Sequence, residues 1–308
     1  MPACKDGSVV TIGTFDGVHL GHQALIGQLT AQAARRGLPA VLLTFEPMPR
    51  EYFARGDPPA RLTTLRERLP VLAGLHVDYT WLLRFGEGLR NLSAEGFAEF
   101  LARELKARLV VVGHDFRFGK NGAASAPMLA ASGKQLGFEV EVVAPVMQGG
   151  ERISSSAVRT ALLRADFAGA QRLLGRPYSM RARVVRGERL GRELGFPTAN
   201  LPLKRRRAPL AGIFAVRVRG AGAGALPGVA SLGTRPTIGG TEALLEAHVF
   251  DFNADLYGRE IEVEFAAKIR DEECFATLAA LAAQMQRDAS AARRILGACA
   301  PADLNELT

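Results

Sequence analysis

The sequence predicts an α/β domain with a doubly wound parallel sheet, followed by an antiparallel β domain. Apolar runs alternate with helical patterns from Val9 to Leu174, an order typical of doubly wound sheets. After Ser179 the apolar period changes from 3.6 to 2, as expected for half-buried strands. The length of 308 residues also favours two domains, because one domain usually takes about 100 to 200 residues.

The first half is expected to contain five strands and at least five helices. Gly37 ends the first helix, and the first strand, helix and strand together have the length of a right-handed βαβ unit with parallel strands. The strands are expected at 9–13, 40–45, 79–83, 109–112 and 139–143, and the helices at 22–36, 62–73, 93–105, 127–136 and 156–174.

The second half alternates apolar and polar residues in short segments separated by Gly and Pro turns. In one of them, Ile261, Val263 and Phe265 alternate with glutamates. This pattern predicts an antiparallel barrel or sandwich, and a final amphipathic helix over 275–296 is expected to pack against it. The glycine-rich stretch Gly220 to Gly228 reads as a hairpin connection. We place the domain boundary between residues 176 and 177, giving domains 1–176 and 177–308.

Composition narrows the class of protein. No apolar run approaches the ~20 residues that cross a bilayer, and the N-terminus lacks the order of a signal peptide, so we expect a cytoplasmic protein without a membrane partner. The cysteines Cys4, Cys274 and Cys299 lie far apart, with no metal-binding spacing. The formal net charge of +8 suits an anionic partner, either nucleic acid or phosphorylated small molecules, or simply a basic surface.

Two histidines flank a glycine where the first strand gives way to the first helix. In doubly wound sheets this loop is the expected ligand site. His19 and His22 can face the same way at a helix start, where free backbone N–H groups attract anions, and Gly21 leaves room for a phosphate. The pattern predicts a polyphosphate site; without a nearby carboxylate or cysteine it makes a poor zinc site.

A second anion site is expected at "RISSSAVR", where serines precede a helical pattern and Arg159 follows within a turn; plain helix capping is the alternative. The segment "GHDFRFGKN" does not have the spacing of a Walker loop, which argues against a P-loop kinase. Nucleotidyl transfer fits these residues, because an attacking phosphate oxygen is already anionic and needs positioning and charge neutralisation instead of a strong base.

Two groups of polar residues in the second half are candidate site residues. Thr198 and Asn200 lie two apart, so in an extended segment both can reach a hydrated Mg²⁺. Glu246, His248 and Asp251 fall in an alternating strand whose other face carries Leu245 and Ala247. The alternative readings are ordinary turn residues and solvent-facing polar side chains, but a base beside a bound alcohol is what a kinase needs.

The first half resembles the adenylyltransferase module of bacterial bifunctional riboflavin kinase/FAD synthetases, within the HxGH nucleotidyltransferase superfamily. Four stretches carry the resemblance: "GTFDGVHLGHQ", "TFEPMPREYF", "GHDFRFG" and "RISSSAVR". It implies a Rossmann-like sheet in which His19 and His22 contact the ATP phosphates. It further implies nucleotide binding by Gly13, Phe15, Asp16, Gly21, Ser155, Ser156 and Arg159, and flavin binding by Asp115 and Phe116.

Two positions depart from the family pattern. Met48 stands where the family usually has histidine, and the loop from Lys120 to Ser125 lacks the usual arginine and Gly-Asp pair. Both changes are expected to remove polar groups from the rim of the flavin and nucleotide site, and so to bear on the efficiency of adenylyl transfer.

The second half resembles the riboflavin kinase module, through "GRELGFPTANL", "GVASLGTRPTIGG", "LLEAHVFDFNADLYGREIEVEF" and "KIRDEECFATLAAL". The resemblance implies a six-stranded antiparallel barrel. In it Thr198 and Asn200 hold Mg²⁺ and ATP, Glu246 activates the terminal ribityl hydroxyl, and Gly187 and Gly191 form a nucleotide-binding loop. Arg235 is assigned to the flavin.

The sequence therefore predicts a bifunctional enzyme that converts riboflavin to FMN and FMN to FAD, with ATP as co-substrate and Mg²⁺ as cofactor. Its partners are these small molecules; the oligomeric state is not predicted. One rival is a basic RNA-binding barrel, but the single tryptophan, Trp81, lies in the first half and the later strands carry mostly aliphatic residues and glutamates. Another rival is a cytidylyl- or pantetheine-type adenylyltransferase with a fused β domain.

Overall fold

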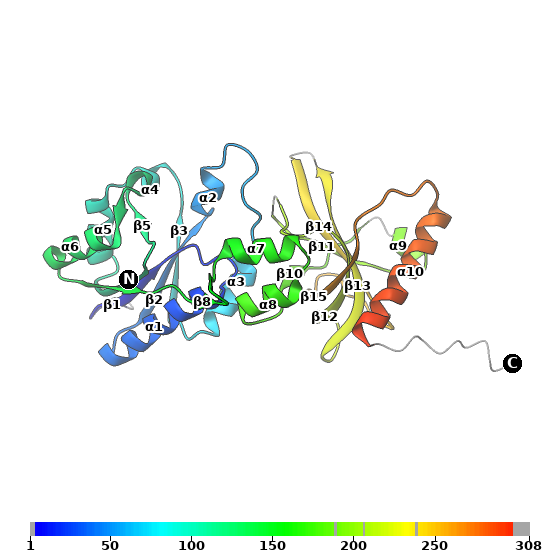
Figure 1. Cartoon of the computed structure of the whole chain (residues 1–308), viewed down its shortest axis with the longest axis horizontal. Helices are drawn as coiled ribbons and strands as arrows, with labels where there is room; N and C mark the ends of the chain where they lie inside the picture. Colours follow the sequence, from blue (N-terminus) through cyan, green and yellow to red (C-terminus); the bar gives the residue numbers. More distant parts are fainter. Residues whose placement is uncertain (1–3, 188–189, 206, 238–239, 298–308) are drawn as a thin grey trace. The chain divides into compact units, whose positions relative to one another are not determined.

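The computed structural model describes residues 4–187, 190–205, 207–237 and 240–297; the side chains at 190 and 235–242 are not described. The chain forms two compact units (Figure 1). The first contains the chain up to Pro59 and Leu65–Ala157, and the second contains Ala60–Thr64 and the chain from Val158 onward.

The first unit is built on a parallel sheet of five strands in the order β3-β2-β1-β4-β7. Since β1 lies between β2 and β4, the strand order reverses beside it, and ligands bind doubly wound sheets at such a point. This confirms the predicted fold. The strands are β1 (Ser8–Ile12), β2 (Ala40–Glu46), β3 (Tyr79–Arg84), β4 (Ala107–Gly113) and β7 (Glu139–Val143).

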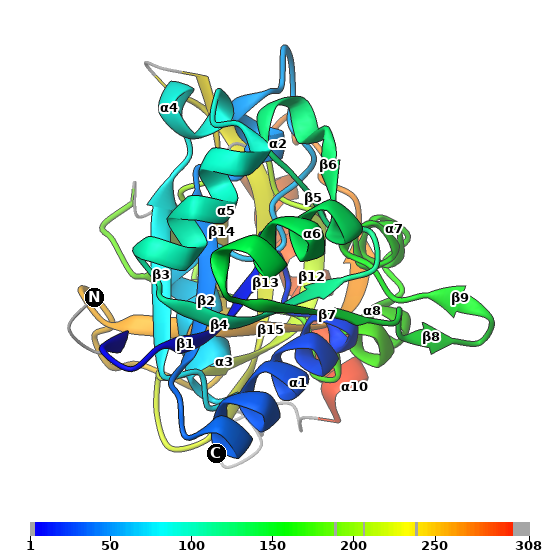
Figure 2. The ribbon, with the colours of Figure 1, turned by 90° about the vertical axis from the view of Figure 1, so that its left-hand side faces the viewer.

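Helices cover both faces of this sheet (Figure 2), because successive residues of its buried strands point to opposite sides. Val9 packs in a cluster with Ile26 of α1 and Leu72 of α3, whereas Val10 packs in a separate cluster with Leu101 of α5 and Leu129 of α6. The helices are α1 (Leu20–Arg36), α3 (Leu65–Ala73), α5 (Ala94–Arg103) and α6 (Ala126–Leu136).

Short elements complete the first unit and were not predicted individually. They are the helices α2 (Pro49–Tyr52) and α4 (Glu87–Arg90), the 3-10 turn η2 (Lys120–Gly122), and the paired strands β5 (Arg117–Phe118) with β6 (Ala124–Ser125) and β8 (Met147–Gln148) with β9 (Glu151–Arg152). The altered loop beginning at Lys120 thus forms a turn and one strand of a small hairpin.

The second unit is an antiparallel sheet of six strands, in the order β10-β15-β12-β13-β14-β11, which confirms the predicted barrel. A bridge between Val185 and Asn200, just past β10, brings the two edge strands together and nearly closes it. The strands are β10 (Ser179–Arg183), β11 (Ala199–Pro202), β12 (Gly212–Arg219), β13 (Ala225–Thr237), β14 (Gly240–Val249) and β15 (Glu260–Arg270).

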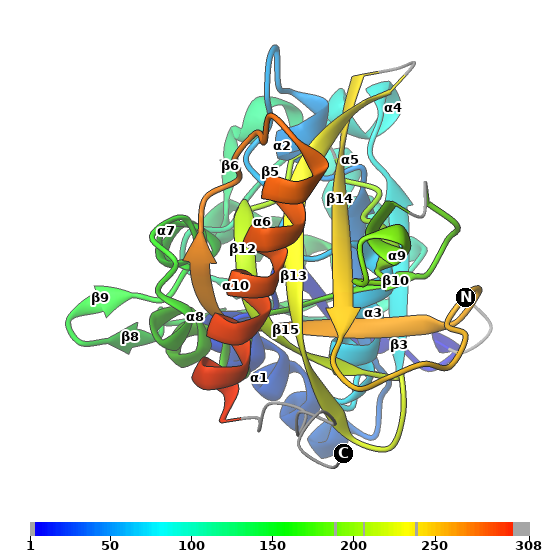
Figure 3. The ribbon, with the colours of Figure 1, turned by 90° about the vertical axis from the view of Figure 1, so that its right-hand side faces the viewer.

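Helices pack on this barrel. Helices α7 (Ser155–Leu163) and α8 (Phe167–Leu174) contribute Val158 and Phe167 to its main core. Helix α10 (Leu278–Leu296) lies along the barrel (Figure 3), where Ala289 and Ala292 form a second, smaller cluster. A short helix, α9 (Leu190–Glu193), precedes β11. The compact units divide after Ala157, whereas the predicted domain boundary lies after residue 176.

Two helices begin three residues later than predicted, for identifiable reasons. Helix α10 begins at Leu278 because Thr277 caps it, its side chain accepting a hydrogen bond from Ala280 N. Helix α3 begins at Leu65 because the preceding Leu62 is fully buried in the core of the second unit. Across the described residues, every helix is too short or too polar to cross a membrane.

Candidate functional sites

The first site lies at the start of α1, directly after β1. His19 is the N-cap residue of this helix, and its Nδ1 accepts a hydrogen bond from His22 N at 3.3 Å. Because Nδ1 accepts, the neutral ring carries its proton on Nε2, which is then a hydrogen-bond donor. The two imidazole rings stack with centroids 3.7 Å apart. The predicted histidine pair is therefore brought together by the helix cap.

His22 is held as a neutral imidazole. Burial lowers its pKa well below the usual value, and the nearby His19, Arg68 and Arg152 lower it further. Its ring meets Phe15 edge-on, with centroids 5.2 Å apart. Within the described part of the chain, its Nδ1 is buried without a hydrogen-bond partner. A buried polar atom of this kind is costly unless a ligand satisfies it, which supports a binding role.

The serine motif lies against the histidine loop. Ser155 Oγ donates a hydrogen bond to Asp16 O at 2.9 Å. A Cβ added at Gly21 would lie 3.1 Å from His19 Nδ1 and 3.4 Å from Ile153 O, so a side chain here would crowd both motifs. Two stretches more than 130 residues apart thus form one site.

The serines of this motif have different roles. Ser154 caps α7, because its Oγ accepts a hydrogen bond from Ala157 N at 3.1 Å. Ser155 binds the Asp16 carbonyl, and Ser156 is exposed. Arg159 donates from Nε to Ala60 O at 2.6 Å, within the second unit. Of the two roles expected for these serines, helix capping therefore applies to Ser154.

The loop residues predicted to bind nucleotide differ in exposure. Phe15 is fully buried in the core and has a positive φ of 50°. Asp16 is also buried, with 2% exposure. A Cβ at Gly13 would lie 3.1 Å from the Phe15 ring. These positions shape the loop by packing.

The residues predicted to face the flavin lie after β4. Asp115 accepts a hydrogen bond from Arg152 at 2.7 Å. Burial would raise the pKa of Asp115, but this bond and the positive charge of Arg152 lower it. Phe116 stacks on Phe118, with centroids 5.6 Å apart. Met48 is 5% exposed, so its side chain packs inward. The local sequence pattern did not indicate this role of Arg152.

The second site is a cavity of about 250 Å³ between the barrel and α10. It lies on the outside of the barrel. Leu245 and Ala247 of β14 point into the barrel core, whereas the alternate residues Glu246 and His248 line the cavity. The residues that line it include Gly191, Phe196, Thr198, Asn200, Ser231, Glu246, His248, Arg270, Glu272 and Asp288.

Strand register brings the predicted kinase residues together. Glu246 of β14 lies opposite Asn200 of β11 on one side and opposite Ser231 of β13 on the other. Thr198 lines the same cavity. A Cβ at Gly187 would lie 2.5 Å from the Asn200 amide nitrogen, so a glycine is needed beside this amide. Gly191 also lines the cavity.

One candidate residue of the second half lies outside the cavity, and the side chain of another is not described. Asp251 pairs with Arg293 of α10 at 2.9 Å and is not among the residues lining the cavity. The backbone of Arg235 belongs to β13, but its side chain lies outside the described residues. The same holds for Arg206 in the basic run from Lys204 to Arg207, in which Arg205 is 4% exposed and donates to Arg61 O at 3.1 Å.

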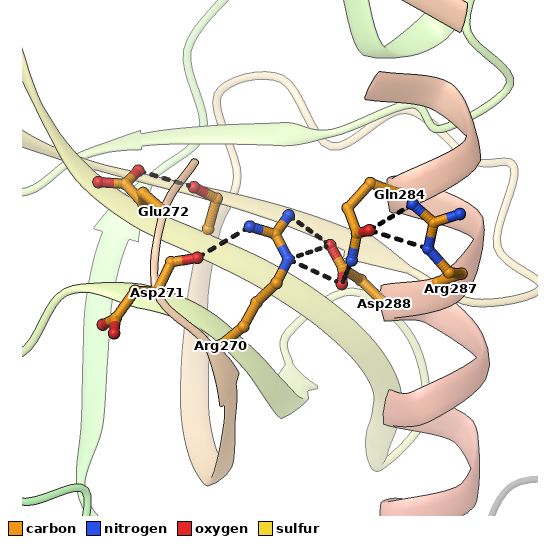
Figure 4. A network of polar contacts seen from close by, with 7 residues as sticks. Arg270, Asp271, Glu272, Gln284, Arg287 and Asp288 are labelled. Atoms are coloured by element: carbon orange, nitrogen blue, oxygen red, sulfur yellow. Dashed lines mark hydrogen bonds and ion pairs between the residues drawn. The ribbon is translucent and has the colours of Figure 1, made fainter. Parts of the chain in front are cut away.

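A network on the far wall of the cavity was not assigned from the sequence (Figure 4). Arg270 at the end of β15 binds Asp288 of α10 through Nη2 at 2.7 Å, and Gln284 donates to the same carboxylate at 2.8 Å. Glu272 accepts a hydrogen bond from Ser231 Oγ at 3.3 Å. The charged run in "KIRDEECF" could have indicated a polar network, but Asp288, the partner of Arg270, lies 18 residues after it in the sequence.

Comparisons with known proteins match both halves of the chain. The FAD synthetase family model matches residues 1–157, and the riboflavin kinase family model matches residues 174–296. A bifunctional riboflavin kinase/FMN adenylyltransferase of Escherichia coli (strain K12) is 46% identical over 301 residues, covering 97% of this chain and 96% of the relative. The chain belongs to the bifunctional riboflavin kinase/FMN adenylyltransferase family.

One further relative and one solved structure are similar to nearly the whole chain. The Pseudomonas fluorescens bifunctional riboflavin kinase/FMN adenylyltransferase is 44% identical over 94% of this chain and 93% of its own length. A crystal structure described as a macrolide-efflux protein from Streptococcus pneumoniae matches with a TM-score of 0.78 and 33% identity, covering 93% of this chain and 94% of that chain. Similarity across both halves supports one shared two-domain fold.

Proposed function

We propose that this chain phosphorylates riboflavin to FMN at the barrel cavity, and adenylylates FMN to FAD with release of pyrophosphate at the histidine loop. ATP is the co-substrate of both steps. The observation that carries the proposal is the row of Asn200, Glu246 and Ser231 across three strands of the cavity wall, in a chain of the family named above. We assign the first activity to residues 177–308 and the second to residues 1–176.

In the kinase step, Glu246 is the general base. Its carboxylate accepts the proton of the terminal ribityl hydroxyl while the hydroxyl oxygen bonds to the γ-phosphorus of ATP, and ADP leaves with the bonding electrons. The half-buried position of Glu246 in the cavity keeps it within reach of a bound alcohol. A Cβ at Gly187 would meet the Asn200 amide, and one at Gly191 would meet Phe196 O, so these two glycines let the backbone lie close to the cavity wall.

The residues present fit Mg²⁺ through Thr198 and Asn200. Asn200 donates from Nδ2 to Thr198 O at 3.4 Å, which leaves its Oδ1 as an acceptor. In kinase sites of this kind, substrate phosphates and water complete the coordination of Mg²⁺. Bound Mg²⁺ would neutralise charge on the transferred phosphoryl group.

In the adenylylation step, a phosphate oxygen of FMN attacks the α-phosphorus of ATP and pyrophosphate leaves. The attacking oxygen is already anionic, so the site requires no base. His19 Nε2–H, His22 and the free N–H groups at the start of α1 are placed to stabilise charge on the phosphates. Flavin contacts in this step are proposed for Asp115 and Phe116, and phosphate contacts for Ser155, Ser156 and Arg159. Arg235, whose backbone belongs to β13 of the barrel, is proposed as a flavin contact of the kinase step.

A chromatographic assay tests this proposal. Purified full-length chain is incubated with riboflavin, ATP and Mg²⁺, and FMN and FAD are followed over time. We expect FMN to appear first and FAD to follow, and we expect a chelator of divalent cations to stop both. A chain that forms neither product, while folded by circular dichroism, contradicts the proposal. FMN without FAD would contradict only the assignment of the histidine loop. We also propose a cytoplasmic location, with no nucleic-acid or membrane partner.

A further inference from the structure

His248 shares a cavity wall with Glu246 and has no part in the proton transfer described above. Both residues lie on β14, two positions apart, and both line the cavity, whereas Ala247 between them is buried in the barrel core. A strand presents alternate residues to one face, so any contact that His248 makes along this wall is fixed relative to Glu246.

The imidazole of His248 binds the backbone of the segment that leads into β11. Its Nδ1 lies 2.8 Å from Pro197 O. A carbonyl oxygen only accepts, so Nδ1 carries the proton and donates it. The ring also meets Phe196 and Phe250 nearly edge-on, with centroids 5.3 and 5.7 Å away. The two aromatic contacts hold the imidazole plane in the direction that makes this hydrogen bond.

Thr198 depends on this contact for its position. Strand β11 begins at Ala199, which pairs with Ala247, so Thr198 lies one residue before the first pair of the ladder. The hydrogen bond from His248 to Pro197 O holds the peptide group that joins Pro197 to Thr198. This bond continues the contact between the two strands beyond their first backbone pair, on the cavity wall where Asn200 lies opposite Glu246.

We propose that His248 is a positioning residue for phosphoryl transfer, which fixes the Thr198 hydroxyl at the proper spacing from Glu246 by donating Nδ1–H to the Pro197 carbonyl. This inference rests on the proposed kinase function. Two residues of β14 then have different roles: Glu246 contacts the alcohol, and His248 positions the Thr198 hydroxyl that contacts MgATP.

Two substitutions separate the hydrogen bond from ring packing. His248→Phe keeps an aromatic ring against Phe196 and Phe250 but removes the donor. His248→Asn loses the ring but places Nδ2 where Nδ1 lies. In assays of FMN formation from riboflavin, we expect His248→Phe to raise the KM for MgATP about tenfold, the loss of one hydrogen bond of about 1.4 kcal/mol, with little change in the KM for riboflavin. We expect His248→Asn to stay within about threefold of the natural protein.

Two further measurements keep the test decisive. FAD formation from supplied FMN, at the other site, should be unchanged in both variants and so controls for folding. Nitrogen-15 NMR of histidine-labelled protein, with the His248 signal identified by its loss in His248→Phe, should show the Nδ1–H tautomer.

The proposal is overturned if the ring is in the Nε2–H form, if His248→Phe leaves the KM for MgATP unchanged, or if both variants lose kinase activity equally while FAD formation persists. Absence of FMN formation by the natural protein would instead refute the kinase assignment itself.

Discussion

At the scale of single residues, the sequence predicted which side chains meet but not their protonation state. His19 and His22 were expected to face the same way at a helix start, and they stack there. That His22 is neutral follows from burial and from its cationic neighbours, and Arg68 reaches this loop from a distant helix. Such long-range contacts leave no trace in local spacing.

Replacing His22 by asparagine should reduce FAD formation from supplied FMN by about 10²- to 10³-fold, the usual cost of one group that stabilises developing charge. The rate of FMN formation should not change. His76→Asn is the control, because His76 is exposed and its positive φ of 59° suits asparagine. Equal losses in both variants would show that His22 has no special role in adenylyl transfer.

The lowered pKa of His22 also predicts how stability varies with pH. In the unfolded chain this histidine takes up a proton below about pH 6.5, whereas in the folded chain it stays neutral to a lower pH. Stability is therefore full above about pH 6.5 and falls as the pH drops below it, by up to about 1.4 kcal/mol at pH 5.5.

Urea unfolding followed by the fluorescence of Trp81, which lies in β3 of the first unit, measures this effect. The difference in unfolding free energy between pH 7.5 and 5.5 should shrink in His22→Asn. An unchanged difference would mean that His22 titrates alike in both states.

Glu246→Gln should lower FMN formation by about 10²- to 10⁴-fold, because glutamine cannot accept the hydroxyl proton. FAD formation from supplied FMN should persist. Glu260→Gln is the matched control, a strand glutamate of β15 that is exposed and does not line the cavity. Retention of normal kinase activity by Glu246→Gln would exclude it as the base.

At the scale of elements, local pattern predicted the strands and helices because each has a periodic apolar face. It missed features that arise from tertiary packing. The segment Ala60–Thr64 contributes Leu62 to the barrel core although its neighbours in sequence belong to the first unit. The attachment of α10 depends likewise on Arg270 and Asp288, which come from different elements.

Asp288→Asn should loosen α10 from the barrel. The side chains of Arg270 and Asp288 are only 17% and 5% exposed, so removing one charge leaves the other nearly buried and unpaired, at a cost of about 3 kcal/mol. Asp251→Asn removes the charge of a carboxylate that is 60% exposed and pairs with Arg293 on the same helix. Because water screens this carboxylate, the change should cost less than about 1 kcal/mol. Chemical unfolding followed by circular dichroism compares them; equal effects would contradict the importance of the buried pair.

At the scale of the whole molecule, the account assigns one reaction to each compact unit, with FMN as the product of one and the substrate of the other. Each unit has its own core and its own candidate site. The predicted two-part organisation follows from the change of apolar period near residue 177. The exact course of the chain between the units does not, since Ala60–Thr64 joins the second unit through contacts distant in sequence.

Mixing two inactivated proteins tests this claim most directly. Glu246→Gln and His22→Asn are each incubated alone with riboflavin, ATP and Mg²⁺, and then together, and FAD is measured by chromatography. We predict little FAD from either variant alone, and FAD formation from the mixture, because FMN made by one protein is used by the other. If the mixture makes no more FAD than the separate variants, although each retains its remaining activity, the two reactions do not occur at independent sites linked by free FMN.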